Sequence, residues 1–364
     1  MKKTILCTKE RPLHQLINDE EKNQITEIII AGYLGGDDLV MLSDMSKYGS
    51  LRLLDMHDVK ELNTEDLWDL EYYPFSDDEH IEDVVLPEKY AIDFPMFKGC
   101  KNLKRVDFSN EIEDSGIGFL SDCPNIEEIY VPGDLRINYD GRYQDDDCFV
   151  GSGKCFVSDI DEWPEDLEHI ASSFFSCDGV LYDASCRDIS LYRYPAGDER
   201  LNFVIPEGVA EICEYAFYSN PYLRSVTIPQ SVKNIQNNPF VNCQNLETII
   251  FKNKVCDTFT CKDAMYAMSI NPYGLCALPH LKDIYMYAES PEEFPFSLFY
   301  GMKNIGDVTL HVPCFCAKKF KDYEIEYYNY SSNERKCEKP WRKFKSIEEF
   351  DPVDFIDIQE TYEK

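Results

Sequence analysis

The apolar residues of this 364-residue chain return in a fixed order. Each copy begins with an aromatic or aliphatic residue, and its further members follow at offsets of three, six, nine and eleven residues. The residue three positions after the first, called here the third-offset residue, is small, amide-bearing, sulfur-containing or aliphatic. The residues at offsets six, nine and eleven are apolar. The two strongest copies begin 23 residues apart, at Phe217 and Phe240. Other copies begin at Phe97, Leu120, Leu275 and Phe299, and a fainter one at Tyr48. A period of this length predicts a solenoid, in which single units are too small to hold a core.

The spacing inside one copy predicts its local structure. The last two apolar residues alternate with polar or variable ones, which is the period of a strand. The six-residue step before them fits a helical turn that leads into the strand. Pro206 and Pro229 follow strands and precede second apolar pairs, Val209 with Ile212 and Val232 with Ile235. We therefore expect coils that each hold a strand, a proline turn, a second short extended segment and a helical turn.

Residues 205–217 and 223–229 resemble the BspA-type leucine-rich repeat. Residues 178–182 with 191–195 resemble an insert common between such repeats, while 25–30 and 309–313 resemble the first and last parts of the family. The resemblance implies an α/β fold, a right-handed leucine-rich-repeat solenoid with short parallel strands, second short extended segments and short helical turns. For exported members it implies adhesion or host-interaction roles.

Five segments are expected along the chain. They are an N-terminal segment (1–40), N-terminal repeats (41–131), an irregular insertion within the solenoid (132–200), C-terminal repeats (201–313) and a C-terminal capping segment (314–364). In the last segment Trp341, Phe344 and Ile347 have the spacing of one helix face. We expect that face to cover the last coil, because an uncovered end would expose core.

The net charge of −32 limits the kinds of partner that the chain is expected to bind. It opposes binding to nucleic-acid backbones and to anionic membrane surfaces, both of which require Lys and Arg. It suits a basic protein partner, or solubility alone. No apolar run reaches the length of a membrane helix, so no membrane insertion is expected. Lys9, Glu10 and Arg11 interrupt the start before any leader-like apolar stretch, which predicts a cytoplasmic protein, or a surface or secreted one if the true start is missing.

The 15 cysteines are an odd number. Cys100, Cys123 and Cys243 occupy the third offset of their copies, where other copies have Asn220, Leu278 and Met302. That variation indicates a buried packing position. The odd count and the absent leader favour reduced thiols, although equivalent positions in adjacent coils could approach closely enough for a disulfide.

Two groups of residues raise the question of a metal. His311, Cys314 and Cys316 lie within six residues, but a structural zinc site needs four ligands and no second pair stands nearby. Asp140 and Asp145–Asp147 form an acidic cluster without the ordered spacing of a calcium loop. We therefore expect neither metal nor cofactor. No phosphate loop, nucleophile elbow or paired catalytic His is present in the sequence, so no catalytic residue is expected.

Between the inward apolar residues of each strand, the alternate side chains should face outward. Columns of such residues are where solenoids usually bind, and Tyr130, Ile250 and Tyr285 are large groups suited to anchor an interface. Ordinary cross-strand packing is the better explanation for any single one of them, whereas the column as a whole favours binding. The predicted binding residues are Arg105, Asp107, Glu128, Tyr130, Thr227, Thr248, Ile250, Asp283, Tyr285 and Thr309, accompanied in the same columns by Leu53, Asp55, Ser225 and Asp307.

The sequence thus favours a non-catalytic scaffold that binds a protein, or a glycan, on its sheet face. An enzyme or metal protein with a site in 132–200 is one alternative. A structural surface protein whose acidity provides spacing and solubility is another. The ligand and the oligomeric state are open at this point.

Overall fold

A computed structural model of the chain describes residues 1–364 apart from 65–66, 68–72, 92–95, 109–110, 114–118, 121, 124, 139–152, 165–172, 187, 237, 255–274, 276–277, 295, 300, 330–333 and 354–364. The chain folds as two compact units. Unit 1 comprises Met1–Arg187 with Arg193–Asp198, and unit 2 comprises Asp188–Tyr192 with Glu199–Lys364.

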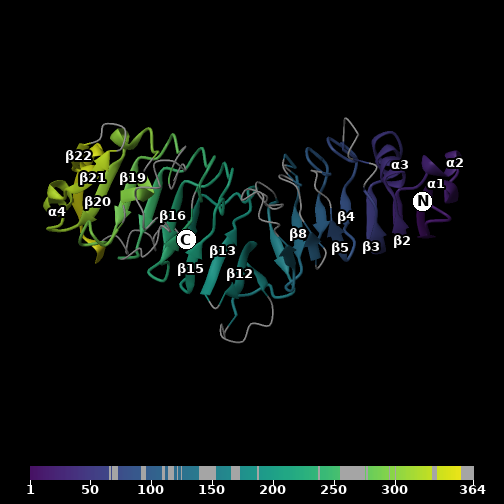
Figure 1. Ribbon diagram of the computed structural model, residues 1–364, viewed down its shortest axis with the longest axis horizontal. Helices are drawn as coiled ribbons and strands as arrows, with labels where there is room; N and C mark the ends of the chain where they lie inside the picture. The colour runs from purple at the N-terminus through teal and green to yellow at the C-terminus, as the bar shows by residue number, and fades with distance from the viewer. Residues whose placement is uncertain are drawn as a thin grey trace. The chain divides into compact units, whose positions relative to one another are not determined.

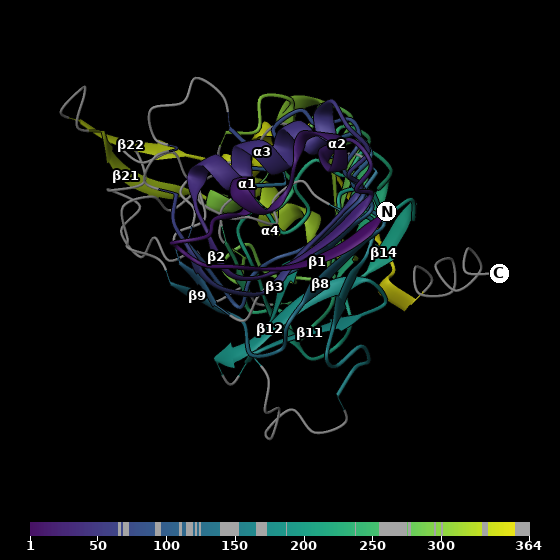
Figure 2. The same ribbon diagram turned by 90° about the vertical axis from the view of Figure 1, so that its right-hand side faces the viewer.

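Unit 1 is built on a seven-stranded parallel sheet whose strands follow the chain order (Figure 1). These strands are β1 (Lys2–Cys7), β2 (Glu27–Leu34), β3 (Leu53–Leu62), β4 (Asp83–Val85), β6 (Arg105–Asp107), β8 (Glu128–Val131) and β10 (Phe156–Ser158). A second parallel sheet contains β5 (Lys89–Ala91), β7 (Glu111–Glu113) and β9 (Arg136–Asn138). Helices α1 (Leu13–Leu16), α2 (Asp19–Lys22) and α3 (Gly36–Lys47) lie together above strands β1–β3 (Figure 2). The antiparallel pair β11 (Phe174–Cys177) and β12 (Val180–Cys186) follows.

Unit 2 repeats this plan with a six-stranded parallel sheet. Its strands are β14 (Asn202–Val204), β16 (Ser225–Ile228), β18 (Thr248–Phe251), β19 (Asp283–Met286), β20 (Thr309–Pro313) and β23 (Ser346–Phe350). The predicted second extended segments form β15 (Val209–Ile212) and β17 (Asn234–Ile235), which pair in parallel beside β13 (Asp188–Arg193). The described residues of unit 2 also form helix α4 (Ala317–Asp322) and the hairpin of β21 (Ile325–Asn329) with β22 (Glu334–Glu338). Short 3₁₀ helices among them are η3 (Phe296–Phe299), η4 (Ile305–Asp307) and η5 (Pro340–Lys343). The prediction of a parallel-strand repeat solenoid is confirmed.

The core follows the repeat template. Phe97, Phe217 and Phe240, at the first position of their copies, are at most 1% exposed. Equivalent rings stack between adjacent coils, with centroids 4.8 Å apart for Phe217 and Phe240. The residue two positions later is left-handed in copy after copy, with φ of 75° at Gly99 and 65° at Asn242. The predicted helical turn is therefore a tight turn closed by one left-handed residue, which redirects the chain into the strand.

The third-offset position has a role beyond packing. The thiols of Cys100, Cys123 and Cys243 each donate a hydrogen bond to the carbonyl oxygen of a phenylalanine one coil earlier, at 3.1, 3.0 and 2.9 Å. Asn220 at the same position instead accepts hydrogen bonds from the backbone N–H groups of Tyr222 and Leu223. Both arrangements satisfy a buried polar group of the turn, which is why a thiol and an amide alternate there.

Two copies differ from the sequence prediction. The copy that was expected to begin at Tyr48 begins instead at Met45, which is buried, and continues through Leu51, Leu54 and Met56. Tyr48 itself is 82% exposed. A further copy begins at Phe75 and was hidden by an acidic residue, Asp78, at the third offset. Asp78 is buried and accepts hydrogen bonds from the N–H groups of His80 and Ile81, as Asn220 does in its own coil.

In the segment 132–200, which is predicted to be an irregular insertion, the described residues include strand β10. Strand β10 pairs with β8 in register and extends the unit 1 sheet. Leu167 and Ile170, a suspected degenerate copy, lie outside the described residues.

The predicted helix face in the last segment is wrong. Trp341 lies in η5, and Phe344 follows the end of that 3₁₀ helix. Ile347 belongs to β23, which is extended because it pairs in parallel with β20. The three side chains are nevertheless buried, and Trp341 packs edge-on against Phe299 and Phe320 with centroids 5.6 and 5.0 Å apart. The last coil is therefore covered by these residues without a regular helix.

Candidate binding faces

The predicted outward residues fall into register rows across each sheet. In unit 1 one row joins Asp83, Arg105 and Glu128, and the next joins Val85, Asp107 and Tyr130. In unit 2 the first row is Ser225, Thr248, Asp283, Thr309 and Ser346, and the second is Thr227, Ile250, Tyr285, His311 and Glu348. The structure therefore brings the predicted residues together as two groups, one in each unit.

Two expectations of exposure and one strand assignment are wrong. Thr227 and Ile250 are each 2% exposed, whereas Val204, at the edge of the same row, is 45% exposed. Central positions in the row are flanked by a neighbouring strand on both sides, so a medium-sized side chain there is covered. Asp307 is part of η4 rather than a strand, because the strand β20 begins only at Thr309.

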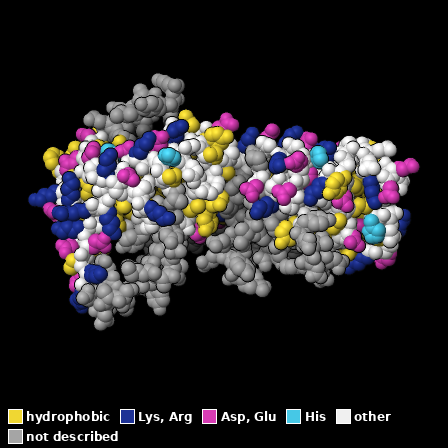
Figure 3. All heavy atoms as spheres, turned by 90° about the horizontal axis from the view of Figure 1, so that it is seen from above, with side chains coloured by type: hydrophobic (Ala, Val, Ile, Leu, Met, Phe, Trp, Pro, Cys, Tyr) yellow, Lys and Arg dark blue, Asp and Glu magenta, His cyan; other side chains and the backbone are white. Residues whose placement is uncertain are grey.

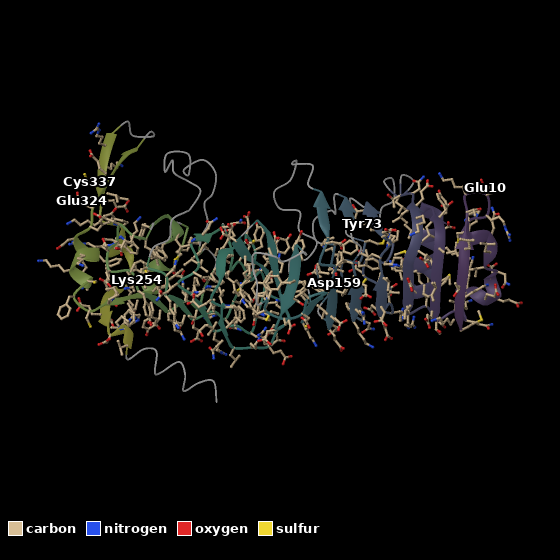
Figure 4. The ribbon with its side chains drawn as sticks, turned by 90° about the horizontal axis from the view of Figure 1, so that it is seen from below. Glu10, Tyr73, Asp159, Lys254, Glu324 and Cys337 are labelled. Carbon is tan, nitrogen blue, oxygen red and sulfur yellow. The ribbon has the colours of Figure 1, made fainter. Side chains whose placement is uncertain are left out.

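In unit 1 the outward arginine is paired with neighbouring carboxylates. Arg105 makes two hydrogen bonds to Asp107, of 2.7 and 3.2 Å, and lies 3.4 Å from a carboxylate oxygen of Glu128. The hydroxyl of Tyr130 donates to Asp159, which also accepts a 2.9 Å hydrogen bond from the N–H of Gly133. Figure 4 labels Asp159 on this unit. We call Arg105, Asp107, Glu128, Tyr130 and Asp159 the Arg105 patch.

In unit 2 the outward side chains of β19, β20 and β23 form an aromatic cluster. The rings of Tyr285 and His311 stack with centroids 4.1 Å apart and an angle of 7°. Phe350 meets Tyr285 edge-on at 5.4 Å and 89°. Nε2 of His311 lies 2.8 Å from a carboxylate oxygen of Asp283, which holds the imidazole plane. We call Asp283, Tyr285, His311, Glu348 and Phe350 the Tyr285 patch.

Both tyrosines carry perturbed hydroxyls. Burial, the hydrogen bond to Asp159 and the surrounding carboxylates raise the pKa of Tyr130 to about 12. Burial, followed by the charges of Asp283 and Glu348, raises the pKa of Tyr285. Each phenol therefore lies in a partly desolvated, electronegative environment and remains a neutral donor at physiological pH.

Sequence reasoning missed four members of these patches. Asp159 lies in the segment that was expected to be irregular, and Glu348 and Phe350 lie in the segment that was expected to cap the coil with a helix. His311 was considered only as a metal ligand, although its offset by two from Thr309 places both on one side of a strand. A strand assigned at 346–350 would have identified Glu348 and Phe350.

The described residues contain no group of three or more His, Cys, Asp and Glu side chains placed to hold a metal ion. Cys314 is exposed, its thiol lying 3.4 Å from the carbonyl oxygen of Phe350, while Cys316 is buried. The acidic cluster at Asp140 and Asp145–Asp147 lies outside the described residues. Among the described helices, none is long and apolar enough to cross a bilayer.

The fold and its outward rows define a repeat scaffold of the leucine-rich class. The family model of the BspA type leucine rich repeat region matches six copies, over residues 60–148 and 189–311. The chain therefore belongs to the BspA-type leucine-rich repeat family. No curated protein sequence matches it.

Solved structures with some likeness come from bacteria. A leucine rich cell surface protein of Faecalibacterium prausnitzii is 20% identical, with 90% of this chain and 73% of that one covered and a TM-score of 0.42. A leucine-rich repeat protein of Eubacterium ventriosum is 16% identical, with 80% and 73% covered and a TM-score of 0.39. The pneumococcal vaccine antigen PcpA is 16% identical, with 81% and 75% covered and a TM-score of 0.35. The family assignment rests on the repeat match.

Proposed function

We propose that this chain is a non-catalytic scaffold that binds a protein through the outer face of the unit 2 sheet, with the Tyr285 patch at the centre of the contact. The observation that carries the proposal is the grouping of Tyr285, His311 and Phe350 on three adjacent strands. Aromatic residues that are already held by their neighbours lose little entropy on binding, so they are effective interface anchors.

The chemistry of the patch favours a basic partner. Glu348 is exposed and Asp283 keeps more than a third of its side chain accessible, beside the faces and edges of two aromatic rings. An arginine or lysine of a partner could satisfy a carboxylate and pack on a ring in one contact. The net charge of −32 would speed the encounter with such a partner.

Thr248, Asp283 and Thr309 extend the proposed contact along the first outward row. Short polar side chains there can hydrogen-bond with a partner around the aromatic centre, as the rim of an interface does. Ile250 and Thr227, being buried, would support the patch from beside it rather than touch the partner.

The test is capture from extracts of the native source and of host surfaces, followed by purification of the captured protein and measurement of its Kd. Glu348→Lys changes one exposed charge without touching the core, and Glu128→Lys makes the same change in the Arg105 patch. We expect Glu348→Lys and Tyr285→Ala each to weaken binding about tenfold or more and Glu128→Lys to leave it unchanged. A partner that binds all variants with equal Kd, or a glycan captured in place of a protein, would overturn the proposal.

A further inference from the structure

The last segment of unit 2 carries positive charge in an acidic chain. Between residues 314 and 345 there are nine Lys or Arg residues and five Asp or Glu, while the whole chain has a net charge of −32. Figure 3 shows Lys and Arg side chains gathered at the end of unit 2 where Figure 1 labels α4. The hairpin of β21 and β22 is of mixed charge, with Arg335 3.5 Å from Glu326 and with Glu324 and Cys337 at its base (Figure 4). The concentrated positive charge therefore belongs to α4 and η5.

Helix α4 presents its lysines outward. Ala317 and Phe320 are buried, and the ring of Phe320 packs against Trp341 with centroids 5.0 Å apart. Lys318 and Lys321, three residues apart and both exposed, lie on one flank of the helix. Within the described part of the chain neither has a carboxylate in salt-bridge distance, whereas Lys101 and Lys104 of the unit 1 coils are each paired with a glutamate.

Backbone carbonyl oxygens hold two further cations of this region. Nε of Arg342 donates a 2.7 Å hydrogen bond to the carbonyl oxygen of Lys321, and Lys319 reaches the carbonyl oxygen of Glu289 at 3.2 Å. Asp322 and Glu338 partly offset this charge, because they pair with Arg342 and Lys343. Glu349 also lies at this helix, because its carboxylate accepts a 3.1 Å hydrogen bond from the N–H of Ala317. Lys318 and Lys321 form no ion pair with these carboxylates.

An exposed aromatic ring stands at the start of the same helix. Phe315 is 89% exposed, the highest value among the large apolar residues that the structure describes. Its φ of 68° is in the left-handed region, which costs a non-glycine residue stability. The turn is fixed on both sides, by hydrogen bonds from the N–H of Cys314 to Phe350 and from the N–H of Cys316 to Pro313. The chain thus holds a large apolar side chain in water at a conformational cost.

We propose that Phe315, Lys318, Lys319, Lys321 and Arg342, named the Phe315 surface, dock unit 2 onto a lipid bilayer with anionic headgroups. An exposed aromatic ring beside lysines matches the side chains that peripheral proteins place at the headgroup boundary, the ring entering the interface and the ammonium groups staying at the phosphates. A free anionic polymer would attract the lysines and gain little from Phe315, so the ring favours the bilayer.

The acidic residues of the earlier coils of unit 2 lie too far away to oppose this contact strongly. The surface lies beyond the last coil of unit 2, so strands β18, β16 and β14 are three to five strand spacings from β23, roughly 14–24 Å. Screening at physiological salt acts over about 8 Å. A bilayer in contact with the Phe315 surface therefore interacts with its lysines, while salt screens the carboxylates of those coils from the headgroups.

The test is flotation of the full chain with vesicles of phosphatidylcholine, with and without phosphatidylserine. We expect the chain to float with the anionic vesicles, and Lys318→Ala/Lys321→Ala to lower the partition coefficient by roughly 25-fold, about fivefold per lysine. Lys98→Ala/Lys154→Ala, which removes the same charge from exposed positions of unit 1, should change nothing. Equal flotation of the two double variants would overturn the proposal.

The aromatic residue has its own test. Phe315→Gly should weaken flotation at least tenfold and leave the Tm unchanged or higher, since glycine tolerates the left-handed turn. Phe315→Trp should show fluorescence quenched by doxyl-labelled lipid. An unquenched tryptophan, or retention on heparin without any vesicle binding, would rule out the bilayer. Tyr285→Ala should float like the intact chain, which keeps failure of this proposal separate from failure of the sheet-face contact.

Discussion

The two parallel sheets share the same pattern of buried aliphatic residues on their inner faces, but the side chains on their outer faces differ. In unit 1, Arg105 is already engaged by Asp107 and Glu128, and the hydroxyl of Tyr130 by Asp159. In unit 2, Tyr285 and Phe350 offer ring surfaces beside an exposed Glu348. The same repeat therefore carries mainly charged, ion-paired side chains on one outer face and a cluster of aromatic rings on the other.

The largest effect should come from the inner rows that both faces share. Ile284 is fully buried beside Ile249 and Leu310 in the register of the sheet. Ile284→Ala should lower the free energy of unfolding by about 2–5 kcal/mol, since it removes buried methyl groups and leaves a cavity. Tyr285→Ala, one residue away on the outer face, should cost only about 1 kcal/mol through lost ring contacts. Chemical denaturation measures both values. A Tyr285→Ala cost as large as that of Ile284→Ala would make the Tyr285 patch a structural cluster.

The second prediction compares how substitutions on the two outer faces change partner binding. Tyr285→Ala should make the binding free energy of the captured partner about 2 kcal/mol less favourable, the usual size for a central aromatic anchor. Arg105→Ala should change the Kd of that partner by less than twofold, because Arg105 is occupied by Asp107 and Glu128. Titration calorimetry gives both numbers. The reverse ranking would assign the contact to unit 1.

A smaller effect concerns Tyr130 at high pH. Its pKa is raised to about 12 from an ordinary value of 10, so the native state holds its proton more tightly than the unfolded chain does. The stabilisation is therefore present below pH 10 and is lost as the pH rises from 10 through 12. Tyr130→Phe should remove that loss and, at neutral pH, cost about 1 kcal/mol for the hydrogen bond to Asp159. Tyrosinate absorbance and denaturation across this range check the sign; stability that rises with pH in the intact chain would contradict it.

The smallest effect belongs to the ion pairs of the Arg105 patch. The side chain of Arg105 is half exposed, and its partners share its charge. Arg105→Ala should change the free energy of unfolding by less than about 1 kcal/mol, and added salt should reduce the difference further. A cost of several kcal/mol would show that this face contributes to folding rather than to solubility.

Much of the fold could be predicted because each coil repeats one set of offsets. The inward residues, the strands and their parallel pairing follow from the alternation around positions such as Val106 and Ile249. The copy at Phe75 escaped notice because Asp78 replaces the small or sulfur residue, and the sequence does not show that its carboxylate caps the turn. Strand β23 escaped because Trp341, Phe344 and Ile347 imitate a helical spacing while they belong to a 3₁₀ turn and a strand.

The candidate site was less predictable for a related reason. Alternation gives the side of a strand on which a residue lies, but not how far its neighbours cover it. Ile250 points to the outer row and is buried there, whereas Tyr285 in the same row remains partly accessible. Replacement of Ile250 therefore tests folding rather than binding. The contribution of Phe350 depends on pairing between β20 and a strand 37 residues later, which a repeat template alone does not reveal.

The most direct test of the account is photo-crosslinking from Glu348. A photoreactive amino acid placed at Glu348 lies within the Tyr285 patch, and the same residue placed at Tyr48, which is 82% exposed, serves as the control outside both patches. We predict one crosslinked protein from position 348, abolished by Tyr285→Ala and absent from position 48. Equal crosslinking from the two positions, or a crosslink that survives Tyr285→Ala, would contradict the claim that the outer face of the unit 2 sheet binds the partner.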